Sequence, residues 1–184
     1  LLNSLRTSLV LAPELAASRT LLVTSARPGE GKTLVAANVA ISLAGLNHRV
    51  LLIDADLRKP RLHEVFRVDQ RPGLTEVLKG QATHGAIHET KVPRLWLIPS
   101  GNPSAHAANL LGSRRFSQLI ECFRQQFDWI VLDSPPVLPV TDACVMTRVA
   151  SGVLFVVESG KTPRHIARAA VERLDAVGAN LVGV

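Results

Sequence analysis

Short, strongly apolar runs recur along the chain and predict buried β-strands. None of these runs alternates apolar and polar residues with a period of two, and strands without that alternation are covered on both faces. The predicted strands are Leu21–Ser25, Arg49–Ile53, Leu95–Ser100, Trp129–Asp133, Gly152–Ser159 and a last one that starts at Leu181.

Segments with helical character separate these strands. In 113–127 apolar residues stand three and four positions apart, and Ser113 suits the helix N-cap. The segment 162–178 carries Pro163 in its expected first turn and Gly178 at its close. The other predicted helices are 1–12, Lys32–Ala44 and two short pieces near Leu62–Phe66 and Leu74–Leu78. Strands that alternate with helices imply right-handed crossovers, so we expect an α/β fold: a three-layer sandwich with a mostly parallel sheet, formed by residues 1–184 as one domain.

The first predicted strand runs into the loop "ARPGEGKT", which predicts phosphate binding. Glycines let backbone N–H groups approach an anion, and the following helix adds its free N-terminal N–H groups. In the usual pattern, GxxxxGK[ST], lysine reaches the outer phosphates and the hydroxyl binds Mg²⁺; here Ala26 replaces the first glycine. A glycine turn before an ordinary helix would not explain the lysine and the hydroxyl. The predicted nucleotide-binding residues are Arg27, Pro28, Gly29, Glu30, Gly31, Lys32, Thr33 and Leu34.

Two further strand ends carry carboxylates. Asp54 and Asp56 follow the strand "RVLLI", and Asp133 ends the strand "WIVLD" as the acid of a Walker B element does. Paired carboxylates at a strand end repel each other unless a cation shares them, and Mg²⁺ prefers oxygen ligands. A helix N-cap plus a surface acid is the alternative explanation of the pair. Ligands bind at the carboxyl ends of parallel strands, so the three strand ends together predict an ATP·Mg²⁺ site in a P-loop NTPase.

Composition narrows the function classes. The 184 residues carry a formal net charge of +6, with basic residues concentrated in "DLRKPRLHEVFRVDQR". A solvated surface, phosphates, an acidic membrane face or an acidic partner chain would each explain that segment, whereas nucleic acid is disfavoured by 4% aromatic residues. Two cysteines, 22 positions apart, form no zinc or disulfide pattern. No apolar run approaches the roughly 18 residues of a membrane span. We expect a piece of a longer protein, because the chain starts without Met inside an amphipathic segment.

The motifs resemble those of the bacterial tyrosine kinases of capsule and exopolysaccharide synthesis. That family has hydrophobic residues before D-x-D-x-R, matched by "LLIDADLR", and a Walker B element that runs into Ser-Pro-Pro, matched by "VLDSPP". Connecting segments such as "GLTEVLKG" and "PPVLPVTDA" also resemble the family. The sequence lacks the H-R-D-L-x-x-x-N and D-F-G runs of eukaryotic-type protein kinases.

The resemblance implies an ATP-dependent tyrosine autokinase and a role for each site residue. Lys32 would hold the outer phosphates, Thr33 would bind Mg²⁺, and Asp56 and Asp133 would hold the waters of the metal. Asp54 would accept the proton of the attacking tyrosine, although the choice between Asp54 and Asp56 as the base stays open. Catalysis would rest on positioning and charge neutralisation.

The resemblance also implies partners and a location. These are other copies of the chain, a membrane-embedded polysaccharide co-polymerase region or activator, either fused or separate, and a tyrosine-rich tail beyond this sequence. The domain would work at the cytoplasmic face of the bacterial inner membrane and control polysaccharide polymerisation and export. The chain has no tyrosine, so it cannot be its own acceptor. The family's E-x-x-R-x-x-R helix is only partly kept, with Arg6 present and Asn3 at the earlier arginine position.

Two alternatives to the kinase stay open. A nucleotide-switch ATPase of the partitioning type would carry a signature lysine early in the phosphate loop, where this chain has Arg27. An export adaptor without catalysis would cycle with nucleotide between assembled and free states, but the intact lysine and aspartates argue against a loss of catalysis.

Overall fold

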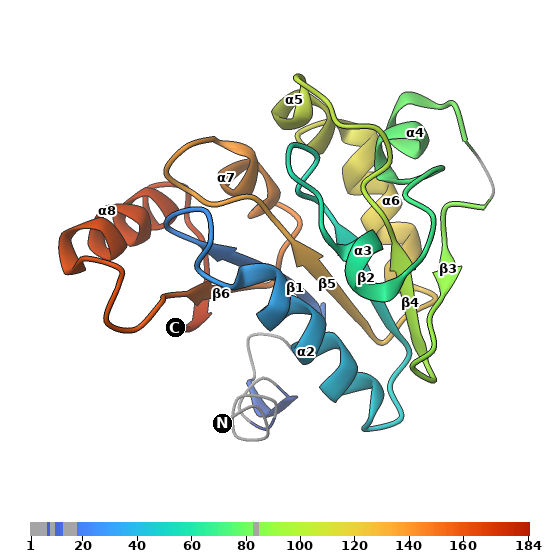
Figure 1. Cartoon of the computed structure of the whole chain (residues 1–184), viewed down its shortest axis with the longest axis horizontal. Coiled ribbons are helices and arrows are strands. Elements are labelled where there is room, and N and C mark those ends of the chain that lie inside the picture. The colour runs from blue at the N-terminus through green and yellow to red at the C-terminus, as the bar shows by residue number, and fades with distance from the viewer. Residues whose placement is uncertain (1–6, 8–9, 13–17, 83–84) are drawn as a thin grey trace.

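One seven-stranded sheet forms the centre of the molecule (Figure 1). The computed structural model describes residues 7, 10–12, 18–82 and 85–184. The strands follow the order β3-β4-β2-β5-β1-β6-β7, and all neighbours are parallel except the β3–β4 pair. Their bounds are β1 Thr20–Ser25, β2 Val50–Asp54, β3 His88–Glu89, β4 Leu95–Ile98, β5 Trp129–Asp133, β6 Gly152–Val156 and β7 Leu181–Gly183. The predicted α/β sandwich with a mostly parallel sheet is confirmed.

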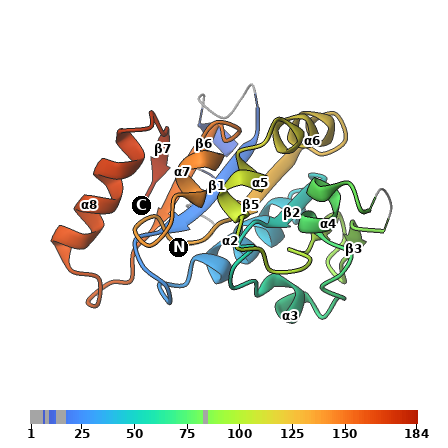
Figure 2. The ribbon, with the colours of Figure 1, turned by 90° about the horizontal axis from the view of Figure 1, so that it is seen from above.

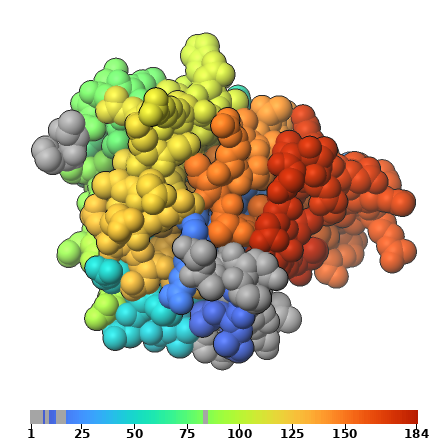
Figure 3. Space-filling model, turned by 180° about the vertical axis from the view of Figure 1, so that it is seen from behind, coloured from blue at the N-terminus to red at the C-terminus, as the bar shows by residue number. Residues whose placement is uncertain are grey.

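Helices cover both faces of the sheet, which explains why the central strands are apolar on both sides. The helix bounds are α2 Lys32–Ala44, α3 Leu62–Phe66, α4 Leu74–Lys79, α5 Ala107–Leu111, α6 Arg114–Arg124, α7 Asp142–Met146 and α8 Arg164–Asp175. On one face α2 and α3 pack on alternate residues of β1, β2, β4 and β5; on the other, α4 to α8 pack on the intervening residues (Figure 2). Figure 3 shows the second face, where α6, α7 and α8 lie side by side.

The main predicted elements occur close to their predicted bounds. The helices Lys32–Ala44 and Leu62–Phe66 and the strand Trp129–Asp133 match the predictions. The Ser113 side chain accepts a hydrogen bond from the Phe116 N–H and caps α6, as predicted. Three short elements were not predicted, namely β3, α5 and α7.

Some predicted features are shifted or lie outside the described residues. The helix predicted from residue 162 begins at Arg164, so Pro163 is its N-cap rather than part of its first turn. Most of the predicted helix 1–12, including Asn3 and Arg6, lies outside the described residues, although Thr7, Val10 and Leu11 are helical. Cys122 and Cys144 are both free thiols. Among the described residues, no helix is long and apolar enough to cross a bilayer.

Candidate functional site

The phosphate loop joins β1 to α2 through two glycines in the left-handed conformation. Gly29 has a φ of +88° and Gly31 a φ of +85°, which L side chains rarely adopt, and a Cβ at either position would meet nothing within 4 Å. Gly31 is the N-cap of α2, and no side chain caps this helix end. The first backbone hydrogen bond of the helix joins the Val35 N–H to the Gly31 carbonyl at 3.0 Å. The loop is therefore shaped to present N–H groups to an anion.

Ala26, the residue that departs from the usual pattern, is compatible with this loop. Its side chain is fully buried, and its φ is not among the positive values of the described residues. No glycine is therefore required at the first position of the loop.

A carboxylate inside the loop links it to the loop between β6 and α8. Glu30 is 8% exposed and accepts a hydrogen bond from the Arg27 N–H at 2.6 Å. The Thr162 hydroxyl donates to the other oxygen of Glu30. This contact joins residues 132 positions apart, and the sequence offered no signal for it.

The lysine at the start of α2 reaches two of the three predicted carboxylates. Lys32 Nζ lies 3.1 Å from Asp56 Oδ2 and 3.6 Å from Asp133 Oδ1, and it donates to the Thr33 hydroxyl at 3.3 Å. Burial works against the charged form of this amine, but Asp133 and Asp56 outweigh it and raise the pKa of Lys32. The strands β2 and β5 pair with Asp54 opposite Asp133, which brings the strand ends together as the parallel sheet predicts.

The two acids after β2 have different surroundings. Asp54 is fully buried, and its Oδ2 accepts hydrogen bonds from the backbone N–H groups of Arg61 and Leu62, at 3.2 and 3.0 Å. Asp56 is 5% exposed, and its Oδ1 accepts from the N–H groups of Arg58 and Lys59. Asp54 therefore also anchors the start of α3. It is not the N-cap of that helix, which is Arg61, and neither acid is the surface acid that the alternative explanation required.

Burial dominates the protonation of two of these acids. It raises the pKa of Asp54 to about 8, with the nearby Asp133 charge acting in the same direction. It raises the pKa of Asp133 to about 6, although Lys32 acts against it. Within the described part of the chain, Asp54 Oδ1 and both oxygens of Asp133 are buried without a hydrogen-bond partner, although Asp133 Oδ1 has the Lys32 ammonium 3.6 Å away. Buried carboxylate oxygens of this kind require a cation or a hydrogen-bond donor.

A model of the AAA domain family matches residues 18–172. The tyrosine-protein kinase YwqD of Bacillus subtilis is 36% identical over 182 residues, which cover 98% of this chain and 77% of YwqD. This chain is a member of the bacterial tyrosine kinases within the AAA domain family.

A polysaccharide transport protein, a kinase domain and a more distant ATPase are also similar to this chain. The succinoglycan biosynthesis transport protein ExoP of Rhizobium meliloti is 40% identical over 171 residues, covering 91% of this chain and 22% of ExoP. The kinase domain of the Escherichia coli tyrosine kinase ETK superposes with a TM-score of 0.92 at 32% identity, covering 99% of this chain and 72% of that one. The cell division ATPase MinD of Pyrococcus furiosus superposes with a TM-score of 0.74 at 26% identity. The match covers 89% of this chain and 69% of MinD.

The family expected from the D-x-D-x-R and Ser-Pro-Pro motifs is thus confirmed, and so is the P-loop NTPase fold. The comparisons support a tyrosine kinase of capsule and exopolysaccharide biosynthesis over the nucleotide switch and the adaptor. The chain spans about a quarter of the length of the longer relatives and about three quarters of the shorter ones.

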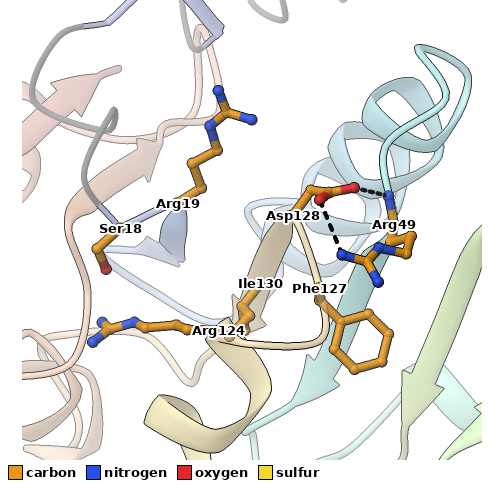
Figure 4. Close-up of a pocket in the computed structure, with 7 residues that line it drawn as sticks. All are labelled: Ser18, Arg19, Arg49, Arg124, Phe127, Asp128 and Ile130. Carbon is orange, nitrogen blue, oxygen red and sulfur yellow. Dashed lines mark hydrogen bonds and ion pairs between the residues drawn. The ribbon is translucent and has the colours of Figure 1, made fainter.

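A separate cavity lies at the amino ends of the strands, opposite the carboxyl ends that carry the candidate site. It has a volume of about 260 Å³ and is lined by Ser18, Arg19, Arg49, Arg124, Phe127, Asp128 and Ile130 (Figure 4). Several of these residues directly precede strands, whereas the candidate site follows strands. Its arginines are partly engaged, since Arg49 pairs with Asp128 at 3.5 Å and Arg124 donates to the Val149 carbonyl at 2.6 Å. The cavity contains none of the predicted site residues.

Proposed function

We propose that this chain binds ATP with Mg²⁺ at the carboxyl edge of its sheet and transfers the γ-phosphoryl group to a tyrosine hydroxyl. The observation that carries the proposal is the position of Lys32. Its amine lies directly after the left-handed glycine loop, within 3.1 Å of Asp56 and 3.6 Å of Asp133. An ammonium shared by two carboxylates next to free helix N–H groups suits a phosphate chain with its metal.

The phosphate loop would supply binding and orientation. The backbone N–H groups from Gly29 to Leu34 would donate to the phosphate oxygens, and Lys32 would turn from the carboxylates to the outer phosphates. Arg27, Pro28 and Glu30 would shape the loop, since the carboxylate of Glu30 already holds the Arg27 N–H. Phosphoryl transfer depends mainly on such positioning and on charge neutralisation.

The residues present fit a magnesium ion held partly through water. The Asp133 oxygens are buried without hydrogen-bond partners, and Asp56 and the Thr33 hydroxyl share contacts with Lys32. Among the described residues, no group of three or more histidine, cysteine, aspartate or glutamate side chains could hold a metal ion by itself. Mg²⁺ typically keeps several waters in such sites, and when bound it neutralises charge on the transferring phosphates. Thr33, Asp56 and Asp133 would hold it.

The proton of the tyrosine would pass to an aspartate of the β2 segment. Asp54 Oδ1 is free of hydrogen bonds, whereas both oxygens of Asp56 have partners. A free oxygen favours Asp54 as the proton acceptor. Because burial raises the pKa of Asp54 to about 8, its ionised form would have to be favoured by the bound metal ion before it could accept the proton. Asp54 is completely buried and Asp56 is 5% exposed, so the tyrosine hydroxyl could reach Asp54 only if residues around it move.

The acceptor would come from outside this sequence, because the 184 residues contain no tyrosine. We propose a tyrosine-rich tail of the whole protein, presented by other copies of the chain in an oligomer. A membrane-embedded polysaccharide co-polymerase region, fused or separate, would hold the domain at the cytoplasmic face of the bacterial inner membrane. The similarity to ExoP, a succinoglycan biosynthesis transport protein, supports a role in polysaccharide export.

Calorimetry and labelled ATP test the proposal in two steps. Lys32→Met should abolish binding of ADP with Mg²⁺, whereas Lys91→Met, at an exposed lysine before β4, should leave it unchanged. With a tyrosine-rich peptide and any activator segment it requires, the chain should label tyrosine. Asp54→Asn should slow that transfer by roughly 100-fold or more while ADP binding persists, since a general base contributes about 10²–10⁴-fold.

Two results would contradict the proposal. Unchanged nucleotide binding in Lys32→Met would remove the site assignment. ATP hydrolysis without any tyrosine labelling, with the native tail and activator present, would favour the nucleotide switch.

A further inference from the structure

An ion pair between an exposed arginine, Arg58, and a buried aspartate, Asp142, joins the two loops that follow β2 and β5. Asp142 is fully buried at the start of α7, nine positions after Asp133. Its Oδ2 accepts from Arg58 Nε at 2.8 Å and its Oδ1 from an Arg58 terminal nitrogen at 3.1 Å. This two-point geometry fixes the guanidinium in orientation as well as in position.

The residue that makes this pair also holds a site carboxylate through its backbone. The Arg58 N–H donates to Asp56 Oδ1 at 3.3 Å, and the Lys59 N–H donates to the same oxygen at 3.0 Å. The other oxygen of Asp56 lies 3.1 Å from Lys32 Nζ. The orientation of Asp56 toward Lys32 therefore depends on where residues 58 and 59 lie.

We propose that Arg58 and Asp142 are positioning residues that set the orientation of Asp56 for the metal and the nucleotide. The proposal rests on the function proposed above. Neither residue touches the reacting atoms; the pair ties the segment that carries Asp56 to the segment that follows Asp133, across 84 positions of sequence. Carboxylate ligands need such supporting contacts, and their loss typically costs 10–100-fold in metal affinity or activity.

The Arg58–Asp142 pair is not needed merely to hold the segment after β2 in its folded position. The same segment has other anchors: Leu57 is fully buried, and its carbonyl accepts from the Ser104 N–H at 2.9 Å. Loss of the ion pair should therefore leave the segment in place and release mainly the Arg58 and Lys59 N–H groups that hold Asp56.

The test compares Asp142→Asn and the double variant Arg58→Gln/Asp142→Asn with Arg61→Gln. The asparagine is nearly isosteric, and the double variant leaves no unpaired charge, so at least one should fold. Arg61 is the control because its side chain is 70% exposed and pairs with Glu64 in the same segment. Arg61→Gln removes one positive charge, as Arg58→Gln does in the double variant, whereas Asp142→Asn removes one negative charge. Circular dichroism verifies folding.

Two readouts separate positioning from stability. In the metal-free, nucleotide-free chain, the Lys59 amide should exchange hydrogen roughly tenfold faster in both Asp142 variants than in the wild type or in Arg61→Gln. By calorimetry, the gain in ADP affinity on adding Mg²⁺ should fall roughly 10-fold or more, while ADP affinity in EDTA stays at the wild-type level.

A Mg²⁺-dependent gain equal to the wild type in both folded variants would overturn the inference, even if the Lys59 amide exchanged faster. An equal loss in Arg61→Gln would overturn it as well, since the effect would then not require the Arg58–Asp142 pair. If the wild type bound no nucleotide, the proposed function would fail first.

Discussion

Replacement of Glu76 should weaken the support of the loop behind the site. Glu76 lies in α4, and its Oε2 accepts from the Gly73 N–H at 2.8 Å. Its Oε1 accepts from the backbone N–H and the side-chain amide of Asn102, at 3.0 and 2.8 Å. The carboxylate thus holds α4 against the segment after β4. That segment continues to Ser104, whose N–H binds the carbonyl of Leu57, next to Asp56.

The size of the effect follows from the donors that lose their acceptor. In Glu76→Gln the amide oxygen can keep both Asn102 donors, but the amide nitrogen then faces the Gly73 N–H. Gly73 is buried, and a buried donor without an acceptor costs about 1–3 kcal/mol. The two remaining hydrogen bonds lose the charge of the carboxylate, which weakens each by about 0.5–1 kcal/mol. We expect a total loss of about 2–5 kcal/mol in the free energy of unfolding at pH 7.

The pH dependence of this loss has a definite sign. Burial alone would raise the pKa of Glu76, but the hydrogen bonds from Asn102 and Gly73 outweigh it and lower the pKa. A carboxyl whose pKa is lowered in the folded state stabilises that state above its unfolded pKa of 4.5 and loses the contribution as pH falls through the folded value. The difference between wild type and Glu76→Gln should therefore shrink below about pH 4.5.

Urea unfolding at pH 7 and at pH 4, followed by circular dichroism, measures both quantities. The matched control is Glu121→Gln, because Glu121 is 61% exposed and pairs with Arg124 on the surface of α6. An exposed pair of this kind contributes about 0–1 kcal/mol. A loss at pH 7 no larger than that of the control, or a difference that grows as the pH falls, would refute the reasoning.

Two further predictions concern the same loop and the proposed metal site. Gly73→Ala should cost about 3 kcal/mol or more in the free energy of unfolding, because its Cβ would lie 2.2 Å from the Gly101 nitrogen. Gly160→Ala, at a φ of +76° with nothing within 4 Å, should cost only about 1–2 kcal/mol, and equal losses in urea unfolding would contradict the steric argument. Asp133→Asn should weaken the Mg²⁺ dependence of nucleotide binding in calorimetric titrations, and an unaltered metal titration would make Asp133 a structural residue.

The central strands and the longer helices could be predicted because each has its own local signal. The runs in β1, β2 and β5 are apolar on both faces, as expected of strands between two helical layers. Ser113 is a local N-cap signal, and the structure shows its hydrogen bond to the Phe116 N–H. The shift of the α8 start to Arg164 concerns only the first turn, where helix boundaries are least determined by local sequence.

The elements that were missed depend on contacts that are distant in sequence. β3 is two residues long and pairs antiparallel with the edge of β4, so it has too few residues to show a period. α5 and α7 have five residues each and no side-chain cap. α7 begins at Asp142, whose carboxylate is held by Arg58 from a loop 84 positions away. Nothing in the sequence near residue 142 indicates that contact.

The candidate site was more predictable than these elements, because the rule for parallel sheets places strand ends together. Lys32, Asp56 and Asp133 lie within one cluster, as the strand-end argument required. The rule could not distinguish the two acids after β2. Only the structure shows that Asp54 is fixed by the start of α3, whereas Asp56 points to the lysine.

The charge balance of the cluster explains why a nucleotide with its metal suits this edge better than either one alone. Asp54, Asp56 and Asp133 face a single ammonium, that of Lys32, since the charge of Arg58 is already paired with Asp142. Burial raises the pKa of both Asp54 and Asp133, so full ionisation of the three acids is costly without another cation. A phosphate chain without metal would bring more negative charge to these acids. A divalent ion bound with the phosphates would instead balance two carboxylates and leave Lys32 free to reach the outer phosphates.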